Sequence, residues 1–415
     1  MLLVGGIDPR EWRALERERT VVQPDASTVG APISLDGLGD AELRTFRRDT
    51  QSDTRRYDFA IADCTTGFLW HCLFRLDGNR TPFAIAPRYN HVQAKEAFAL
   101  LLSSQFADEQ DVLFCGSHAA SRAFGMFGFR CVPTYIPGID HSRYRPLRGG
   151  RRAARRALGV DGKNRDVLVY AGRMAPDKHI LELLDAFALI REHRNAELVL
   201  CVNFPTPGYA ERCLSRAQEV RDVRVVEAPD NTELVQWYNA ADVFVTISVS
   251  IFETFGRAPV ESMACGTPPV VSAYSGLRET VTPDTGFVVP TKRVGLKKMP
   301  DVGAFADTVL SALSDRNTLE AKSAAAIIRA RHYDMPSAVA ALQSEMCGRA
   351  VRSDRVVNSR LDLDRYPPVV SALWESLHGC DIETLTMEFL RSGRLPVQPH
   401  PDAVSQYFEA WFADY

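Results

Sequence analysis

The sequence lacks the marks of a nucleic-acid-binding, membrane or secreted protein. Lys and Arg total 49 against 52 Asp and Glu, giving a formal net charge of −3. No positive excess therefore attracts nucleic acid or an acidic membrane. No apolar run reaches about 18 residues, so we expect no transmembrane segment. The opening MLLVGGIDPREW has no basic stretch followed by a long apolar one, so we expect no signal peptide.

Metal-binding and nucleophile motifs are also missing. The nine cysteines occur singly, and none forms Cys-x-x-Cys or stands at zinc-finger spacing from a histidine. No GxSxG, HExxH or P-loop motif occurs. Cysteines such as Cys115 in DVLFCGS and Cys265 in ESMACGT lie in apolar segments. This pattern indicates buried, reduced thiols and predicts a cytoplasmic protein.

The length and the hydrophobic pattern predict two α/β domains. A chain of 415 residues with 46% apolar residues is too long for one ordinary core. Apolar strands alternate with helices twice, which favours two Rossmann-like, doubly wound parallel sheets facing a central cleft. We predict domains at 1–145 and 146–347, and a helical C-terminal extension at 348–415.

Two further segments have distinctive composition. Arg151, Arg152, Arg155 and Arg156 lie close together in a polar stretch, and we expect them to form a solvated helix face. The extension is rich in aromatic side chains, which are seldom left in water. It is therefore expected to pack on the body of the protein or to form a homodimer.

The segment ETFGRAPVE holds two carboxylates around a forced bend. Pro259 suits the first turn of a helix and Gly266 suits its end, so a helix begins just before Pro259. Glu253 then lies in the preceding loop and Glu261 in the first turns. The amides of residues 256–258 would face an anion, and the acids would accept hydrogen bonds from sugar hydroxyls. An ordinary capped helix is the alternative.

Two other loops carry the remaining candidates. VLVYAGRMAPDK places Arg173 and Lys178 after the first strand of the second domain, where Rossmann-like domains bind phosphate. A guanidinium and an ammonium there would neutralise a diphosphate. A pair of surface cations is the alternative. YSGLRET gives a further tight loop at Gly276.

Taken in order, AGRMAPDK, ETFGRAPVESMACGTPPVV and SGLRETV resemble the retaining family 4 glycosyltransferases of the GT-B fold. YIPGIDHSRYRP resembles the family's crossing into the second domain, with Pro137-Gly138 in place of the usual Asn-Gly. The resemblance spans roughly residues 130–345.

The resemblance implies a role for each matching residue. Arg173 and Lys178 would hold the diphosphate of a nucleotide-sugar donor. Glu261 would bind the ribose hydroxyls, and Glu253 would face the donor sugar near its C3 and C4 hydroxyls. The amides that would contact sugar and phosphate belong to Thr254, Phe255, Gly256, Arg257 and Ala258.

First-domain residues complete the predicted site. His91, after FAIAPRYN, resembles the family's histidine that touches the sugar, although a lone histidine is more often structural. His91 joins Glu253, Arg173 and Lys178 in the predicted catalytic set. Gly5 and Gly6 resemble the family's first glycine loop.

The resemblance implies retaining, metal-independent transfer of a sugar from a nucleoside diphosphate-sugar to a small-molecule acceptor. UDP, GDP and ADP remain open as the nucleotide. The arginine-rich composition suggests a GC-rich bacterium and hence specialised metabolism, including antibiotics. A nucleotide-sugar epimerase or hydrolase and a non-catalytic nucleotide-sugar-binding scaffold remain as alternatives. No cofactor and no nucleic-acid partner are expected.

Overall fold

The computed structural model describes the second half of the chain most completely. The described residues are 2–4, 60–62, 80–85, 110–125, 129–134, 138–160, 164–204, 207–250, 253–294 and 297–346, with single positions and runs of two or three residues between 68 and 108. The chain divides into two compact units, residues 138–337 and residues 1–137 with 338–415. Each unit is described by itself below.

The first and last residues of the second unit are in main-chain contact. The main-chain N–H of Ile139 donates to the carbonyl of Tyr333 at 2.8 Å, and Ile139 forms a parallel bridge with Asp334. These contacts tie the beginning and the end of the range Gly138–Ser337 together. The unit therefore begins and ends several residues before the predicted range 146–347.

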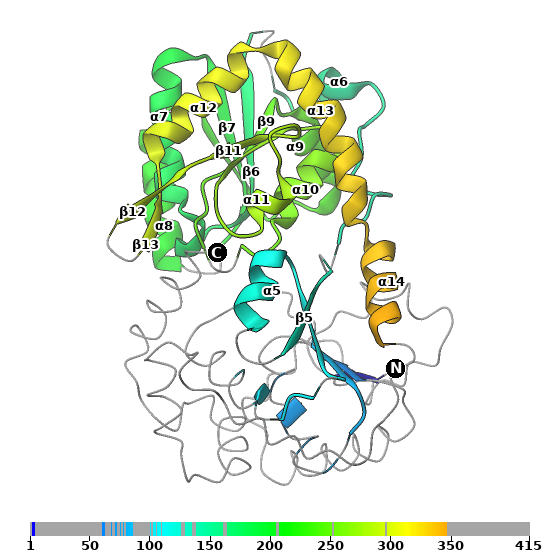
Figure 1. Ribbon diagram of the computed structural model, residues 1–415. Helices are drawn as coiled ribbons and strands as arrows, with labels where there is room; N and C mark the ends of the chain where they lie inside the picture. Colours follow the sequence, from blue (N-terminus) through cyan, green and yellow to red (C-terminus); the bar gives the residue numbers. More distant parts are fainter. Residues whose placement is uncertain are drawn as a thin grey trace. The chain divides into compact units, whose positions relative to one another are not determined.

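A six-stranded sheet forms the centre of this unit, in the order β11-β10-β9-β6-β7-β8, and every pairing in it is parallel (Figure 1). Its strands are β6 (Asp166–Arg173), β7 (Ala196–Asn203), β8 (Val223–Glu227), β9 (Val243–Thr246), β10 (Pro269–Ser272) and β11 (Phe287–Val289). The middle strands are nearly continuous apolar runs because both faces of a parallel sheet are covered.

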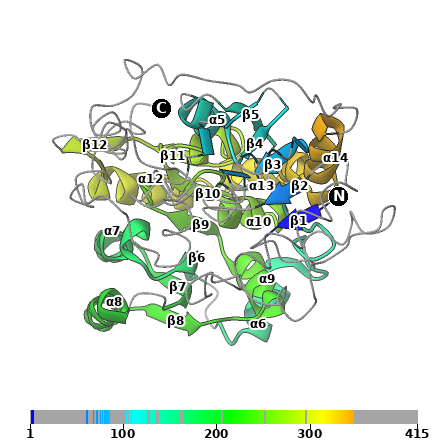
Figure 2. The ribbon, with the colours of Figure 1, turned by 90° about the horizontal axis from the view of Figure 1, so that it is seen from below.

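Helices cover both faces of this sheet. Figure 2 shows α7, α8 and α12 on one face and α6, α9, α10 and α13 on the other. The helices of this unit are α6 (Gly150–Ala157), α7 (Ile180–His193), α8 (Pro207–Glu219), α9 (Asn231–Ala240), α10 (Arg257–Ala264), α11 (Leu277–Thr280), α12 (Val302–Ser314) and α13 (Arg316–Ala330), with 3-10 turns at η1 (Pro176–Lys178) and η2 (Arg331–Tyr333). Helix α14 (Met335–Met346) has most of its residues in the first unit.

Sequence pattern explains these helices. In α7, Ile180, Leu183, Leu184, Phe187 and Ile190 are buried, and their spacing places them on one helix face. Aspartate side chains cap the first turns of α9, α12 and α13, where they accept hydrogen bonds from main-chain N–H groups. The apolar side of α7 and the neighbouring strands form the main core of the unit.

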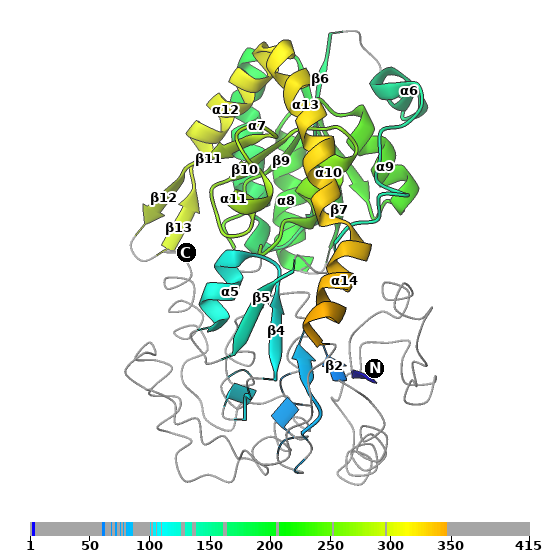
Figure 3. The ribbon, with the colours of Figure 1, turned by 45° about the vertical axis from the view of Figure 1, so that its right-hand side comes forward.

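The first unit contains a parallel sheet in the order β1-β2-β3-β4-β5. Its strands are β1 (Leu2–Val4), β2 (Ala60–Ala62), β3 (Phe83–Ile85), β4 (Val112–Cys115) and β5 (Arg130–Pro133). Helix α5 (His118–Gly125) lies beside β4 and β5 (Figure 3). Two parallel α/β sheets were the architecture predicted from the sequence.

The hairpin that follows β11 was not predicted. Strands β12 (Thr291–Val294) and β13 (Lys297–Pro300) pair antiparallel as a hairpin next to β11 (Figure 1). The six described cysteines are free, and all but Cys131 are buried, as predicted. Within the described ranges no helix is long and apolar enough to cross a bilayer, and no three His, Cys, Asp or Glu side chains group as metal ligands. The predicted extension at 348–415 lies outside the described residues.

Candidate active site

The sheet order of the second unit locates a ligand site before any side chain is considered. β6 and β9 are adjacent and parallel, and the chain continues from β6 to β7 and β8 on one side and from β9 to β10 and β11 on the other. The order therefore reverses between β6 and β9. Ligands of open α/β sheets bind at the carboxyl ends of the strands at such a switch point. The loops after β6 and β9 carry the predicted donor-binding residues.

Four charged side chains meet in these loops, and we name Arg173, Asp177, Lys178 and Glu253 the strand-end cluster. Arg173 Nη2 donates to Asp177 Oδ2 at 2.8 Å. Lys178 Nζ lies 2.5 Å from Glu253 Oε2 and 3.7 Å from Asp177 Oδ2. The side chains of Lys178, Asp177 and Glu253 are mostly buried, whereas that of Arg173 is 37% exposed. Two cations and two carboxylates thus form one connected group.

Hydrogen bonds to the main chain hold the cluster in place. Tyr170 Oη donates to the carbonyl of Arg173 at 3.1 Å, and Ser248 Oγ donates to the carbonyl of Asp177 at 3.0 Å. Burial raises the pKa of Tyr170 well above its ordinary value, and the carboxylates of Glu253 and Asp177 add to the increase. Tyr170 therefore stays a neutral donor that fixes the end of β6.

The amino terminus of α7 does not offer its first amides to a ligand. The hydroxyl oxygen of Tyr209 accepts hydrogen bonds from the main-chain N–H groups of Ile180 at 2.9 Å and Leu181 at 3.4 Å. His179 precedes the helix with φ 54° and ψ 45°, a left-handed conformation uncommon for a residue other than glycine. The loop after β6 therefore presents cationic side chains, not a set of amides.

The loop after β9 is shaped by two glycines. Gly256 has φ 78° and occupies the N-cap of α10, where no side chain makes a capping hydrogen bond. A Cβ on Gly276 would lie 1.8 Å from the carbonyl oxygen of Thr254. The YSGLRET loop thus packs main chain against main chain on ETFGR, which only glycine allows. Helix α10 begins at Arg257 as predicted, and Glu253 lies in the loop before it.

Glu261 occupies a different environment from Glu253. Its carboxylate is buried, with 5% of the residue exposed, and accepts hydrogen bonds from Tyr238 Oη at 3.1 Å and Arg257 Nε at 2.9 Å. Burial raises the pKa of Glu261 above its ordinary value, and Arg257 followed by Tyr238 offsets only part of the increase. The Tyr144 hydroxyl also faces this carboxylate. The two acids of the motif therefore have separate partners.

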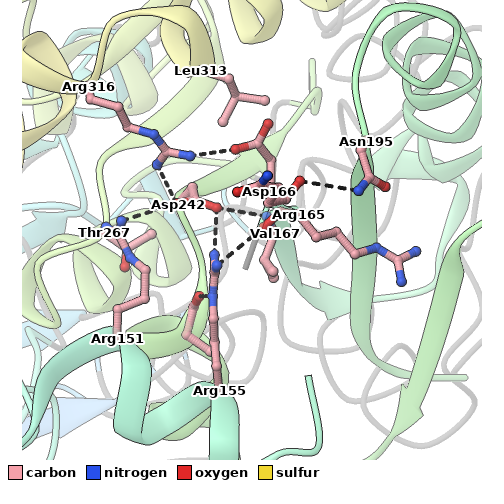
Figure 4. A network of polar contacts seen from close by, with 12 residues as sticks. Arg151, Arg155, Arg165, Asp166, Val167, Asn195, Asp242, Thr267, Leu313 and Arg316 are labelled. Carbon is pink, nitrogen blue, oxygen red and sulfur yellow. Dashed lines mark hydrogen bonds and ion pairs between the residues drawn. The ribbon is translucent and has the colours of Figure 1, made fainter. Parts of the chain in front are cut away.

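A second charged group lies at the opposite ends of the same two strands, and we name it the strand-start cluster (Figure 4). Its central carboxylate belongs to Asp242, whose side chain is 1% exposed and accepts from the main-chain N–H of Val167 at 2.8 Å. The cations that surround it are Arg151 at 3.0 Å, Arg155 at 2.6 Å and Arg316 at 2.5 Å. Asp166 completes the cluster through its own ion pair with Arg316 at 2.5 Å.

These contacts correct the prediction of a solvated arginine face on α6. Arg151 and Arg155 are four residues apart, so they share a face of the helix and point toward Asp242 (Figure 4). Arg152 and Arg156 are exposed, as predicted. The sequence pattern missed the inward pair because its partner carboxylate lies about 90 residues away along the chain.

The structure gathers some of the predicted residues and not others. It brings Arg173, Lys178 and Glu253 together, and Thr254–Ala258 leads from them into α10. His91, Gly5 and Gly6 lie outside the described residues, so their roles stay predictions, as do the homodimer and the cytoplasmic location. Sequence reasoning missed Asp177, although its place between Arg173 and Lys178 was an available signal.

The part of the chain that contains both clusters matches a known family. Residues 151–330 match the family described as Glycosyl transferases group 1. The matched segment, which is less than half of the chain, is similar to group 1 glycosyltransferases. It contains the strand-end cluster, Glu261 and both shaping glycines.

Curated relatives match this chain over a similar stretch. D-inositol 3-phosphate glycosyltransferase 2 of Catenulispora acidiphila is 30% identical over 239 residues, which cover 55% of this chain and 53% of the relative. A GDP-mannose-dependent alpha-(1-6)-phosphatidylinositol dimannoside mannosyltransferase of Mycobacterium tuberculosis is 30% identical over 195 residues, which cover 47% and 49%. The chain spans about half the length of these relatives.

Solved structures show the same fold. HepE of Anabaena, in complex with UDP and glucose, superposes with a TM-score of 0.61 at 18% identity, covering 74% of this chain and 82% of HepE. Sucrose-phosphate synthase of Thermosynechococcus elongatus gives 0.60 at 18% identity, covering 79% and 85%. At this identity the likeness concerns the fold alone. It confirms the predicted GT-B class with two Rossmann-like units.

Proposed function

We propose that this protein is a retaining, metal-independent glycosyltransferase that moves a sugar from a nucleoside diphosphate-sugar to a small-molecule acceptor. The observation that supports it most is the gathering of Arg173, Lys178 and Glu253 at the switch point of a domain similar to group 1 glycosyltransferases. Ion pairs also occur in this domain away from the switch point, so the position of this group at the carboxyl ends of the strands is what favours a ligand role.

The charges of the cluster suggest how the chain would assist transfer. Arg173 and Lys178 would neutralise the departing diphosphate, and Glu253 would accept hydrogen bonds from hydroxyls of the donor sugar. Helix α10 would direct its amino terminus at the same anion. The departing diphosphate would take the acceptor proton on the face that it leaves, which retains the anomeric configuration. Catalysis would then rest on positioning and charge stabilisation.

Names of relatives narrow the substrates to test. One relative is named for D-inositol 3-phosphate, and another for GDP-mannose and a phosphatidylinositol dimannoside. HepE was solved with UDP. We therefore propose a UDP- or GDP-sugar donor and a polyhydroxylated acceptor of the inositol type. Neither of these two relatives is named for an antibiotic acceptor.

The test begins with binding and continues to turnover. UDP, GDP and ADP are titrated calorimetrically, with and without Mg²⁺, into wild type and Arg173→Ala. The sugar donors of the nucleotide that binds are then incubated with inositol phosphates. Nuclear magnetic resonance gives the anomeric configuration of the product. We expect one nucleotide to bind, Arg173→Ala to weaken it, and a product with the donor's configuration to form with chelator present.

Each alternative has its own outcome. Donor consumption that does not depend on acceptor would indicate a nucleotide-sugar hydrolase, and a change of the donor sugar itself would indicate an epimerase. Absence of binding by all three nucleotides would leave a scaffold that keeps the fold without the ligand. Loss of activity with chelator would overturn the metal-independent mechanism, and an inverted product would overturn the retaining one.

A further inference from the structure

We propose that Asp177 is an internal anion that competes with the donor diphosphate for Arg173 and Lys178, and thereby speeds release of the nucleotide product. This inference rests on the proposed function, because it takes the strand-end cluster as the diphosphate site. Asp177 would not bind the donor itself. It would adjust the affinity of Arg173 and Lys178 for the diphosphate.

The position of one carboxylate oxygen is the first observation. Asp177 Oδ2 lies 2.8 Å from Arg173 Nη2 and 3.7 Å from Lys178 Nζ. A single oxygen is thus within ion-pairing distance of both cations that would hold the diphosphate. An oxygen of a bound diphosphate would pair with the same guanidinium and ammonium groups, because both groups bind carboxylate and phosphate alike.

The main chain around Asp177 is fixed independently of its side chain. Ser248 Oγ donates to the Asp177 carbonyl at 3.0 Å, and the N–H of Lys178 donates to the carbonyl of Ala175 at 2.9 Å. Arg173 is likewise held by the pairing of β6 with Asn203 of β7. The carboxylate can therefore turn away by side-chain rotation alone, and the loop does not need it to keep its shape.

The ion pair to Arg173 has the character of a replaceable contact. It uses one guanidinium nitrogen, Nη2, and the Arg173 side chain is 37% exposed. Single-nitrogen, part-exposed ion pairs are weak, whereas a phosphate can engage the guanidinium through two nitrogens. A diphosphate would therefore displace the carboxylate from Arg173, and the reverse exchange would accompany departure of the product.

Charge balance makes the effect of this exchange measurable. With Asp177 in place, the two cations and two carboxylates of the strand-end cluster sum to zero. Removing the Asp177 charge leaves a net positive group for the anionic nucleotide. Product release limits turnover in many enzymes, and where it does, a variant that binds product more tightly turns over more slowly.

The experiment compares three variants by calorimetry and stopped-flow release, with UDP, GDP and inorganic pyrophosphate as the probes. Asp177→Asn and Asp177→Ala remove the charge, and Asp177→Glu restores it. The matched control is Asp185→Asn, which removes an exposed carboxylate paired with Arg216 on the next helix. We expect Asp177→Asn and Asp177→Ala to bind about five- to tenfold more tightly at low salt, and less so at high salt. Their release should slow in proportion. Asp177→Glu, which keeps the charge, should gain less affinity than either of them, and Asp185→Asn should bind as wild type does.

Unchanged or weaker binding by both charge-removing variants would overturn the inference, because Asp177 would then serve to orient Arg173. An equal gain in Asp185→Asn would overturn it as well, since the effect would belong to overall charge. If wild type binds neither the nucleotides nor pyrophosphate, the proposed function itself fails. Circular dichroism and melting temperatures confirm that each variant is folded before binding is compared.

Discussion

The two charge clusters described in the second unit both pair basic side chains with carboxylates, at opposite ends of the same strands. In the strand-start cluster, three arginines and a main-chain N–H surround the buried carboxylate of Asp242. In the strand-end cluster, Arg173 has one carboxylate partner and Lys178 is shared between two. A saturated carboxylate holds the fold in one arrangement, whereas a sparsely paired cluster can exchange an internal partner for a ligand.

The largest effect on the molecule is expected when the saturated cluster is broken. Asp242→Ala would leave three arginines and the N–H of Val167 without their shared acceptor. We expect the free energy of unfolding to fall by about 3–5 kcal/mol, because removal of one buried partner leaves uncompensated charges. Denaturant unfolding measures this change. As a control, Glu219→Ala removes an exposed partner of Arg216 and should change stability by less than about 1 kcal/mol. Equal effects of the two changes would contradict the contrast between the clusters.

A change in the sparsely paired cluster should affect turnover much more than it affects stability. Lys178→Ala removes the ammonium that faces both Asp177 and Glu253. We expect kcat to fall by roughly 10²- to 10³-fold, the usual loss when a group that stabilises developing negative charge is removed. Lys292→Ala is the matched control, since that lysine also pairs with a carboxylate, Asp301 at 2.8 Å, in another part of the domain. Full donor turnover by Lys178→Ala would remove this residue from the site.

The main-chain packing behind the strand-end cluster gives an intermediate effect. In Gly276→Ala the new Cβ meets the Thr254 carbonyl, so the loop that carries Glu253 must shift. We expect a loss of about 1–3 kcal/mol in stability, typical of overpacking, together with weaker nucleotide binding. Gly208→Ala serves as the control, because a Cβ there meets nothing within 4 Å. Thermal unfolding and calorimetry of both variants test the difference.

Local pattern was enough to predict most of the second unit. The range of α7 follows from the spacing of its buried Leu and Ile residues, and the start of α10 follows from Pro259 and the preceding glycine. The β12–β13 hairpin was not predicted, because TKRV and KKMP are short and polar and carry little apolar alternation. The spacing of residues within one helix or strand can be read from the sequence. The pairing of one strand with another cannot.

The same distinction explains which site residues were found. Arg173, Lys178 and Glu253 stand in loops whose position after a parallel strand can be read from the alternation of elements. The partners of the buried acids cannot be read in this way. Tyr238 contacts Glu261 from 23 residues away, and Arg151 contacts Asp242 from 91 residues away. Such pairs are fixed by the three-dimensional order of strands and helices, which local spacing does not contain.

Glu261 is buried like Asp242 but has fewer cationic partners, so it is intermediate between the strand-start and strand-end clusters. The smallest expected effect concerns the titration of its carboxylate. The carboxylate is buried like that of Asp242, yet its pKa is raised, because Arg257, Tyr238 and Tyr144 offset only part of the effect of burial. Between the ordinary value of 4.5 and the higher folded value, the native state binds more protons than the unfolded state. Its contribution to stability is therefore present below pH 4.5 and is lost as pH rises through the folded pKa.

Glu261→Gln removes this titration, so the stability of the variant minus that of wild type should rise with pH across the same window and then level off. Denaturant unfolding at closely spaced pH values measures the difference, in which the titration of all other groups cancels. Glu182→Gln is a matched control of opposite sign. Its hydrogen bond with His179 lowers the pKa of Glu182, so wild type gains stability as pH rises toward 4.5 and the difference should fall. If the Glu261→Gln difference falls with pH as the Glu182→Gln difference does, the buried carboxylate of Glu261 has no raised pKa, and its donors saturate it as the arginines saturate Asp242.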